Sequence, residues 1–548
     1  MAGLTFDPYS YNFGSLRRTI HSKKGMVACT HPLAAEAGLR MLWKGGNAID
    51  ACVAMAMILP LVEPAATTYG SDNFAIFWTK DKLHGMSSSG WSPAKLTEEY
   101  VKSKGYTAMP RSGWDSTTIP GCVRGWVNLV EKFGKLTLAD VAQPAIEYAE
   151  EGHPMTPYVV GSFDKRLGMI SPLISDEQIE NFRKVWYKHG KAPAPGQLCH
   201  FPEMGRFLRE VVETNGESVY SGKIAQAIVD LSKKTGGLWE MEDFENFDSI
   251  FHDPLRVNYR GVEVCELPPN GQGIVALMAL NILKGFEFGE YDFGTPRTLH
   301  LQMEALKLAF ADGKRYIADQ EYMTQVTCDD LLNEKYAEER RALIDMNKAQ
   351  DFKAGDPTAS DTVYFAAADT DGNMISMIQS CYTPFGSGVV VPEYGLALQS
   401  RCASFTIEDG HPNNAGPHKR PYQTIIPAFL MKDGKPLGPF GLMGGYMQPQ
   451  GHTQVVMNMV DFHMNPQNAL DAPRFCWSAG LNFDLEDHFN PAVIDALVRK
   501  GHQISTHNAY TADYCDRPFG RGQIILLTDE NTLIGGTEGR GDGAIYCR

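Results

Sequence analysis

The sequence predicts one large α/β unit, and three observations lead to that prediction. Segments with helical spacing of apolar residues alternate with strand-like apolar runs along the 548 residues. Hydrophobic residues make up 43% of the chain and charged residues 21%, which is ordinary for a globular protein with a large core. Only residues 345–361 have the composition of a linker, and no internal repeat or low-complexity tract interrupts the rest. Length alone is compatible with about two to four domains, but the scarcity of linkers favours one.

The first part of the chain is predicted to be rich in helices. The run MVACT, which starts at residue 26, is strand-like and precedes a helix in which Leu33, Ala37, Leu39 and Met41 have roughly helical spacing. The pair Gly45-Gly46 ends that helix, because glycine adopts the backbone conformations that close a helix. Further helices are expected at 48–58, 125–150, 205–233 and 299–318, of which the last is the clearest amphipathic one.

The chain changes character near residue 345. Residues 345–361 are polar, contain Gly355 and Pro357, and have no apolar period, so we expect an exposed, mobile segment. Two strand-like runs, TVYFAAAD and MISMIQS, follow around the sequence TDGN, which is a strong hairpin signal. Thr362 opens the first of these strands, directly after the polar segment.

Composition excludes several classes of partner. The net charge of -15 argues against nucleic acid or an anionic membrane as a general partner, because both attract basic surfaces. The N-terminus lacks the apolar region of a secretory signal, and the longest apolar stretch, 48–62, is interrupted by Asp50 and Pro60 and is too short to span a bilayer. The 11 cysteines are scattered without a CxxC pair, so we expect neither a disulfide framework nor a zinc site, and a cytoplasmic location.

Several motifs together resemble the γ-glutamyltranspeptidase family of N-terminal-nucleophile hydrolases over nearly the whole chain. Before residue 361 they are HPLAAEAGLRMLWKGGNAIDACVA, LVEPAATTYGSDNFAIFW, TTIPGCVRGW, LPPNGQGIVALMALNIL and MEALKLAFADGKRYIAD. After it they are DTDGN, FGSG, GPHKRP, GLMGG and DAPRF. Each motif alone is weak, but their order and spacing are specific.

The resemblance implies a fold and a maturation event. The fold is a four-layer αββα sandwich, with two stacked sheets between layers of helices. Cleavage after Asp361 produces fragments 1–361 and 362–548, which stay together as one joint domain and act as a heterodimer, alone or as a dimer of such pairs. The resemblance implies no metal and no cofactor.

The resemblance also assigns catalytic roles. Thr362 matches the nucleophile, and cleavage makes it an N-terminal residue whose α-amino group serves as its base, with a pKa near neutrality. Ser380 matches a second threonine that hydrogen-bonds the nucleophile, and serine keeps the hydroxyl. Gly444 and Gly445 match the glycine pair whose N–H groups form the oxyanion hole.

The substrate site departs from the family pattern. An arginine that binds the α-carboxylate of the γ-glutamyl group is replaced by Ser89, and an aspartate that binds its α-amino group is replaced by Ser404. Tyr382 replaces an asparagine, and Gln423-Thr424 replace a serine pair. Charge-assisted contacts of this kind are each worth about 1.5–3 kcal/mol, so a γ-glutamyl substrate loses much of its affinity. We therefore expect a small acyl amide that bears a carboxylate, as in the family's cephalosporin-type acylases and its oxamate amidohydrolase.

Arg401 is the candidate replacement anchor. It stands in QSRCASF, where relatives commonly have glutamine, and it is suited to a carboxylate placed differently on the substrate, with Tyr382 as a nearby donor. The alternative for Arg401 is a surface or structural ion pair, and for Arg420 we expect a structural role.

Other hypotheses about function remain open at this point. The chain can be a true γ-glutamyl hydrolase or transferase, or an uncleaved family member that binds without catalysis. A serine or metal hydrolase is disfavoured because no GxSxG or HExxH motif occurs. His411, His418 and His452 lack ligand spacing and are expected in loops, as solvated or capping residues.

Overall fold

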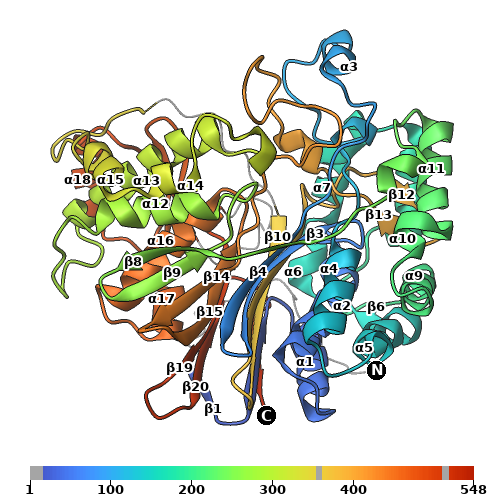
Figure 1. Ribbon diagram of the computed structural model, residues 1–548, viewed down its shortest axis with the longest axis horizontal. Coiled ribbons are helices and arrows are strands. Elements are labelled where there is room, and N and C mark those ends of the chain that lie inside the picture. Colours follow the sequence, from blue (N-terminus) through green and yellow to red (C-terminus); the bar gives the residue numbers. More distant parts are fainter. Residues whose placement is uncertain (1–16, 353–360, 509–517) are drawn as a thin grey trace.

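Two seven-stranded sheets stack face to face between two layers of helices (Figure 1). This computed structural model describes residues 17–352, 361–508 and 518–548. The arrangement is the four-layer αββα sandwich that the family resemblance implied, and that expectation is confirmed.

The first sheet combines strands from both sides of residue 361. All of its neighbouring strands are antiparallel. In spatial order it contains β21 (Ala544–Cys547), β2 (Gly25–Cys29), β10 (Asp361–Asp369), β11 (Met374–Tyr382), β3 (Asp72–Thr79), β4 (Lys82–Ser88) and β7 (Ile250–His252). Its outer face is covered by a layer that includes α1 (Pro32–Trp43), α2 (Ala48–Val62), α4 (Cys122–Phe133) and α5 (Leu138–Glu151) (Figure 1).

The second sheet is also antiparallel and also mixed in origin. In spatial order it contains β1 (Ile20–Ser22), β20 (Leu533–Thr537), β19 (Arg521–Leu527), β15 (Lys435–Met443), β14 (Ala428–Lys432), β9 (Val262–Glu266) and β8 (Leu255–Tyr259). Helices α12 (Gly273–Leu283), α16 (Met447–Val460) and α17 (Pro466–Asp471) cover its outer face (Figure 1).

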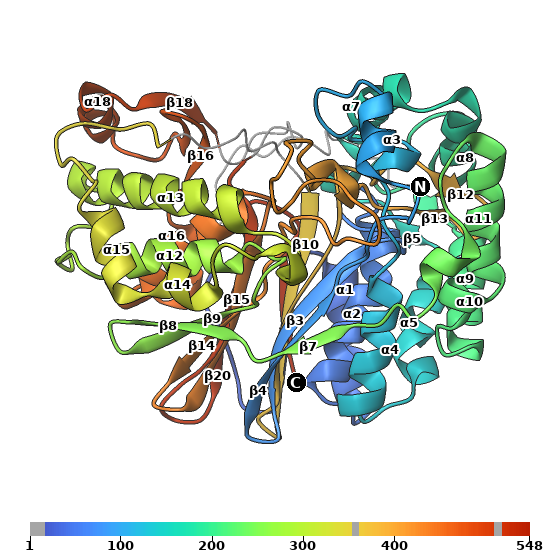
Figure 2. The same cartoon turned by 45° about the horizontal axis from the view of Figure 1, so that its top comes forward.

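A further layer lies outside α12. Helix α13 (Pro296–Tyr316) packs on α12, and beyond it lies a three-stranded sheet of β16 (Phe475–Ala479), β17 (Asn482–Glu486) and β18 (Gln503–His507) with α18 (Pro491–Arg499) (Figure 2). The shorter elements are α3 (Glu98–Ser103), α6 (Pro157–Val160), α7 (Phe163–Ile170), α8 (Asp176–Trp186), α14 (Cys328–Leu332), α15 (Glu334–Arg341), β5 (His153–Pro154), β6 (Leu198–Cys199), β12 (Val390–Val391) and β13 (Leu396–Ala397).

Apolar cores join the layers. Phe74 and Ile76 of the first sheet meet Phe429 and Ile525 of the second, and all four side chains are fully buried. Helix α2 is buried at each of its 15 residues. A helix that is apolar on all sides is stable only inside a protein, so α2 belongs to the core between the first sheet and its neighbouring helices.

The helices expected near residues 32, 48 and 299 are present as α1, α2 and α13. The two longer helical stretches are each divided. The stretch 125–150 is split between α4 and α5 by Gly134, which caps α4 through bonds to the carbonyls of Leu129 and Val130. The stretch 205–233 contains α9 (Pro202–Glu213), α10 (Ser218–Ser221) and α11 (Lys223–Thr235), because Gly216 turns the chain with a φ of 80°.

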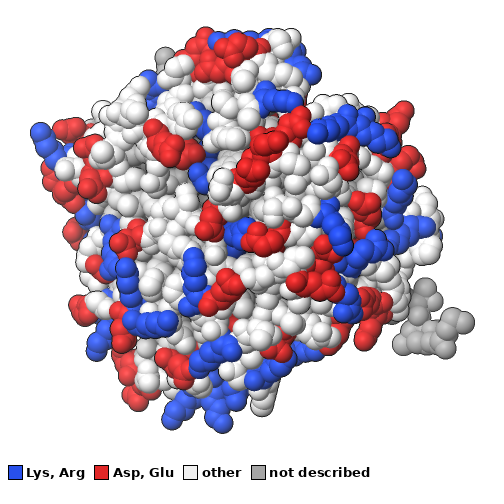
Figure 3. Space-filling view, turned by 45° about the vertical axis from the view of Figure 1, so that its right-hand side comes forward, with Lys and Arg blue, Asp and Glu red and all other residues white. Residues whose placement is uncertain are grey.

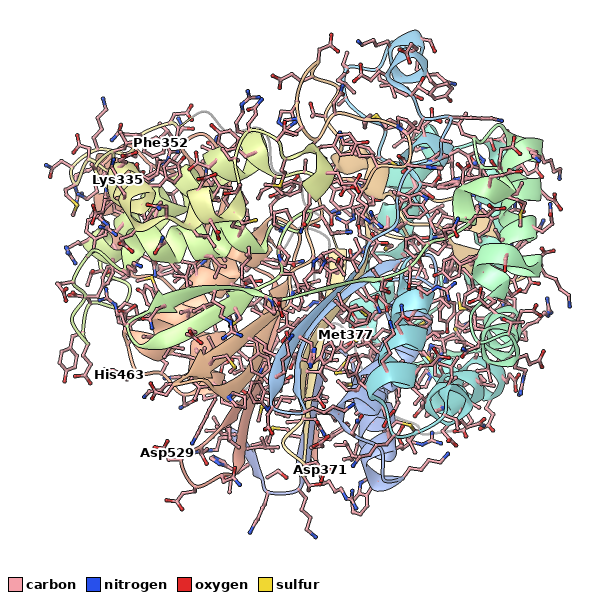
Figure 4. The ribbon with its side chains drawn as sticks, in the orientation of Figure 1. Lys335, Phe352, Asp371, Met377, His463 and Asp529 are labelled. Atoms are coloured by element: carbon pink, nitrogen blue, oxygen red, sulfur yellow. The ribbon has the colours of Figure 1, made fainter. Side chains whose placement is uncertain are left out.

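The predicted hairpin is confirmed as β10 and β11, which pair from Asp361↔Tyr382 to Ala368↔Met374. Figure 4 shows Met377 of β11 near the middle of the molecule and Asp371 at the hairpin tip, the end opposite Thr362. Because β10 also pairs with β2, and β11 with β3, the strand that begins at the expected cleavage point lies inside a sheet built largely before it.

The first residues of the segment 345–361, for which we predicted mobility, contact neighbouring elements. Residues 345–350 are held by hydrogen bonds: His300 Nε2 lies 2.8 Å from the Asp345 carbonyl, Ala349 N donates to Lys500 O at 2.7 Å, and Lys307 Nζ donates to Gln350 O at 2.5 Å. Residues 353–360 lie outside the described residues.

The surface charge and the apolarity of the helices concern possible nucleic-acid and membrane partners. Lys and Arg side chains intermix with Asp and Glu over the face seen in Figure 3. No helix in the described part of the chain is long and apolar enough to cross a membrane.

Candidate active site

Thr362 is the second residue of β10 and is completely buried. Its hydroxyl donates to Ser380 Oγ on β11 at 3.1 Å. The same oxygen lies 3.4 Å from Gln448 Nε2, which donates toward it from the first turn of α16. The Thr362 hydroxyl thus lies between an acceptor, Ser380, and a donor, Gln448, near the start of a central strand.

Ser380 is the meeting point of this network. Besides Thr362, its Oγ accepts from the backbone N–H of Tyr382 at 2.9 Å and lies 3.4 Å from Arg401 Nη2. Tyr382 has a φ of 74°, an uncommon value for a residue with a side chain. Such conformations cost about 1–3 kcal/mol and persist where surrounding structure enforces them. Here the conformation accompanies the bond from the Tyr382 N–H to Ser380.

Gly444 and Gly445 form the turn between Met443, the last residue of β15, and α16. Their φ values are 133° and 60°, in the range that favours glycine. A Cβ at Gly444 would lie 3.2 Å from the Cα of Gly520, so a side chain has little room there. The turn leads into Gln448, whose Oε1 accepts from Ile426 N at 2.9 Å while its Nε2 faces Thr362. The sequence analysis did not identify Gln448 as a site residue. Its position four residues after Gly444 is the one signal in the sequence that could have indicated it.

Arg401 is neither a surface residue nor, within the described structure, a member of an ion pair. It begins the short helix η5 (Arg401–Ser404) and is fully buried. Its Nη1 donates to Thr424 Oγ1 at 2.8 Å, and its guanidinium carbon lies 4.4 Å from the centre of the Tyr382 ring. Burial lowers the pKa of Arg401, and the charge of Asp72 opposes that effect. The guanidinium stays charged, because arginine does not lose its proton in proteins.

Asp72 is the charged site residue that the sequence reading did not identify. It faces Ser380 across the β3–β11 pairing and is completely buried. Oδ1 accepts from Gly90 N at 2.8 Å and Gln399 Nε2 at 2.7 Å, while Oδ2 accepts from Gln423 Nε2 at 2.7 Å. Burial raises the pKa of Asp72 to about 6, against the lowering effect of Arg401.

Ser89 and Ser404, which we predicted to replace substrate-binding residues, form hydrogen bonds with other protein groups. Ser89 Oγ lies 3.5 Å from Asp72 Oδ2 and accepts from Asn270 Nδ2 at 3.0 Å. Ser404 Oγ donates to the carbonyl of Arg401 at 2.6 Å. The structure therefore brings Thr362, Ser380, Tyr382, Arg401 and Thr424 into direct contact, links Ser89 and Gln423 through Asp72, and turns the Ser404 hydroxyl toward the backbone.

Arg420 has structural contacts. Its Nη1 lies 3.8 Å from Asp319 Oδ2, its Nε donates to Ser89 O at 3.2 Å, and its guanidinium lies 5.2 Å from the centre of the Trp91 ring. These contacts agree with the structural role expected for it.

One cluster in the described parts of the chain has the chemistry of metal ligands. Ligand atoms of His300, Glu304 and His502 lie within 4.8 Å of one another. The two imidazoles already pair, with His300 Nδ1 2.8 Å from His502 Nε2. The Lys307 ammonium lies 2.6 Å from Glu304 Oε1, so a cation already balances the carboxylate. We interpret the cluster as an internal network of α13 and its neighbours.

The expectation for the three loop histidines holds for two of them. His411 lies 2.9 Å from the carbonyl of Lys314, and His418 lies 2.9 Å from Asp243 on the surface. His452 is different, because it is buried on α16 and its Nδ1 lies 2.6 Å from Glu266 Oε1. Burial in an apolar layer, which the surrounding letters do not reveal, explains the difference.

The αββα sandwich of two stacked antiparallel sheets is the fold of the N-terminal-nucleophile hydrolases. Residues 34–547 match the family described as Gamma-glutamyltranspeptidase, and the chain belongs to that family. It is therefore an enzyme that hydrolyses amide bonds or transfers their acyl groups.

Three relatives place it within the family. It is 33% identical to a glutathione hydrolase-like YwrD proenzyme of Bacillus subtilis (strain 168), over 96% of this chain and 99% of the relative. It is 30% identical to the acylase ACY 1 proenzyme of Pseudomonas sp. (strain SE83), over 98% and 96%. The crystal structure of a cephalosporin acylase from Bacillus halodurans superposes with a TM-score of 0.94 at 45% identity, covering 99% of both chains.

Proposed function

We propose that this chain is a precursor that cuts itself between Asp361 and Thr362. The Thr362 hydroxyl attacks the Asp361 carbonyl carbon, the peptide C–N bond breaks, and the nitrogen takes up the proton that the hydroxyl loses. Water then hydrolyses the resulting ester, which releases the Asp361 carboxylate and restores the hydroxyl. The products are fragments 1–361 and 362–548, which stay together because β10 and β11 are paired with β2 and β3.

In the mature enzyme the same hydroxyl attacks the substrate amide. The new α-amino group of Thr362 accepts the hydroxyl proton and returns it to the leaving amine, and water or an acceptor amine releases the acyl group from Thr362. Ser380 orients the hydroxyl, at 3.1 Å. The N–H groups of Gly444 and Gly445 stabilise the oxyanion, and the turn that contains them ends in Gln448 beside Thr362.

The acyl group is proposed to bear a carboxylate and to lack an α-amino group. The buried Arg401, two hydrogen-bond lengths from Thr362, is the cation suited to that carboxylate. The buried carboxylate of Asp72 is engaged by protein donors: Oδ1 accepts from Gly90 N and Gln399 Nε2, and Oδ2 accepts from Gln423 Nε2 and lies 3.5 Å from Ser89 Oγ, so it is poorly suited to bind a substrate ammonium. This asymmetry, an available cation beside an anion engaged by protein donors, is the observation on which the proposal rests.

The names of the relatives include both candidate activities, because one is called glutathione hydrolase-like and others are called acylases. The proenzyme names of the YwrD and ACY 1 relatives indicate processing of those proteins, and the acylase names indicate that some members act on acyl amides. A substrate of the γ-glutamyl type remains the second candidate.

Intact-mass spectrometry of the purified protein beside Thr362→Ala tests the processing. We expect two fragments in the wild type, the smaller beginning with Thr362, and one uncut chain in the variant. A folded wild-type chain that stays uncut contradicts the proposal.

A matched set of three p-nitroanilides tests the substrate class. Glutaryl- and γ-glutamyl-p-nitroanilide differ only in the α-amino group, and pentanoyl-p-nitroanilide lacks the carboxylate as well. We expect the highest kcat/KM for the glutaryl compound. Equal or faster turnover of the γ-glutamyl compound favours the second candidate, and equal turnover of the pentanoyl compound removes the carboxylate anchor.

A further inference from the structure

The nucleophile and a buried cation share one hydroxyl. Ser380 Oγ accepts the Thr362 hydroxyl at 3.1 Å on one side and lies 3.4 Å from Arg401 Nη2 on another. All three side chains are completely buried, with relative exposures of 0%. A charge acts over such distances much more strongly inside a protein than in water, because the surroundings screen it less.

The surroundings hold Arg401 in this position. Thr424 Oγ1 accepts from Nη1 at 2.8 Å, and the Tyr382 ring lies under the guanidinium at 4.4 Å. The same Tyr382 donates its backbone N–H to Ser380. Within the described structure no carboxylate forms an ion pair with Arg401, and its Nε has no hydrogen-bond partner, so its charge is not cancelled by a direct contact.

We propose that Arg401 is a positioning residue for the nucleophile, which acts through the Ser380 hydroxyl in addition to any role as a substrate anchor. Its positive charge favours the state in which Thr362 Oγ1 becomes negative as it loses its proton and attacks. The 3.4 Å contact is long for a hydrogen bond, so the effect is mainly electrostatic. The inference rests on the proposed function of Thr362.

Self-cleavage separates the two roles of Arg401, because it requires the nucleophile but no added substrate. A residue that only binds a substrate carboxylate has no effect on the rate at which the precursor cuts itself. A residue that acts on Thr362 changes that rate and its dependence on pH.

The experiment follows cleavage of freshly synthesised precursor from a cell-free reaction, by denaturing gel from pH 6 to 9. We expect Arg401→Gln to slow cleavage by about 10- to 100-fold and to move the pH profile upward. Arg401→Lys keeps the charge and is expected to restore most of the rate. Arg420→Gln is the matched control: it removes a guanidinium that contacts Asp319 and the Ser89 carbonyl rather than Ser380, so its pH profile stays that of the wild type.

A double-mutant cycle with Ser380→Ala tests the route of the effect. If Arg401 acts through Ser380, Arg401→Gln has little further effect in the Ser380→Ala background. Thermal unfolding of each precursor identifies variants that do not fold. If Arg401→Gln does not fold, the pH profile of cleavage by Arg401→Lys tests the proposal instead. Cleavage of folded Arg401→Gln at the wild-type rate and pH profile overturns this inference alone, whereas a folded wild type that never cleaves overturns the proposed function with it.

Discussion

The substitution Gln448→Glu tests whether Gln448 donates to the nucleophile Thr362, because it replaces the Nε2 donor by an oxygen and preserves the shape of the side chain. Its Oε1 accepts from Ile426 N at 2.9 Å, and its Nε2 donates toward Thr362 Oγ1 at 3.4 Å. In Gln448→Glu the first contact persists, because a carboxylate oxygen still accepts the Ile426 N–H. The second contact reverses, because a carboxylate opposes the negative charge that develops on Thr362.

The magnitude follows from the geometry. A donor at 3.4 Å is weak in the resting enzyme, but such contacts shorten as charge develops on the reacting oxygen. Removing a donor of this kind costs about 10- to 100-fold in rate, or about 1.4–2.7 kcal/mol. We expect Gln448→Met to show a loss of this size, and Gln448→Glu a larger one at neutral pH.

Single-turnover acylation with glutaryl-p-nitroanilide measures the effect directly. The Gln448→Glu variant should regain part of its rate as the pH falls, because a protonated carboxyl group donates again toward Thr362. The Gln448→Met variant has no titrating group at this position and should show no such recovery. Wild-type rates for Gln448→Glu across the pH range would refute the assignment of Gln448 to the nucleophile.

Three further predictions concern the same network and the core. Ser380→Ala should reduce acylation by about 100-fold, since it removes the acceptor that orients Thr362, and Ser380→Thr should restore most of the rate; equal rates for both variants would contradict this. Asp72→Ala should lower the thermal unfolding midpoint more than Asp72→Asn, because alanine leaves buried donors unpaired, and the reverse order would argue against the network. Burial lowers the pKa of His31 from 6.5 to about 3, so the native state binds fewer protons than the unfolded chain, and stability is lost as pH falls from about 6.5 toward 3. The urea midpoint of the uncut Thr362→Ala precursor should therefore fall over that pH window. The fall should be smaller when His31→Asn is added.

The local pattern of the chain predicted the features that depend on neighbours in sequence. The TDGN turn between two apolar runs predicted the β10–β11 hairpin and so placed Thr362 at the start of a strand. The GLMGG sequence indicated a glycine turn, and both glycines have positive φ. The motif order pointed to the family, and with it to the sandwich.

Packing gives some residues surroundings that the local pattern does not reveal. Residues 345–350 are polar, yet they are held against α13 and Lys500. His452 lies among polar-looking neighbours in the sequence, yet helix α16 buries it against Glu266. Composition describes the side chains of a segment but not the surface that receives them.

The sequence by itself determined the layered fold, the threonine at the strand start and the glycine turn, because each depends on spacing over a few residues or on motifs in order. Only the tertiary structure decided how the site is charged. Asp72 meets Ser380 through the β3–β11 register, Gln448 reaches Thr362 from α16, and Arg401 lies against Ser380 from η5. These residues are far apart in the chain, and strand pairing and layer stacking, rather than any local period, bring them together around Thr362 and Ser380.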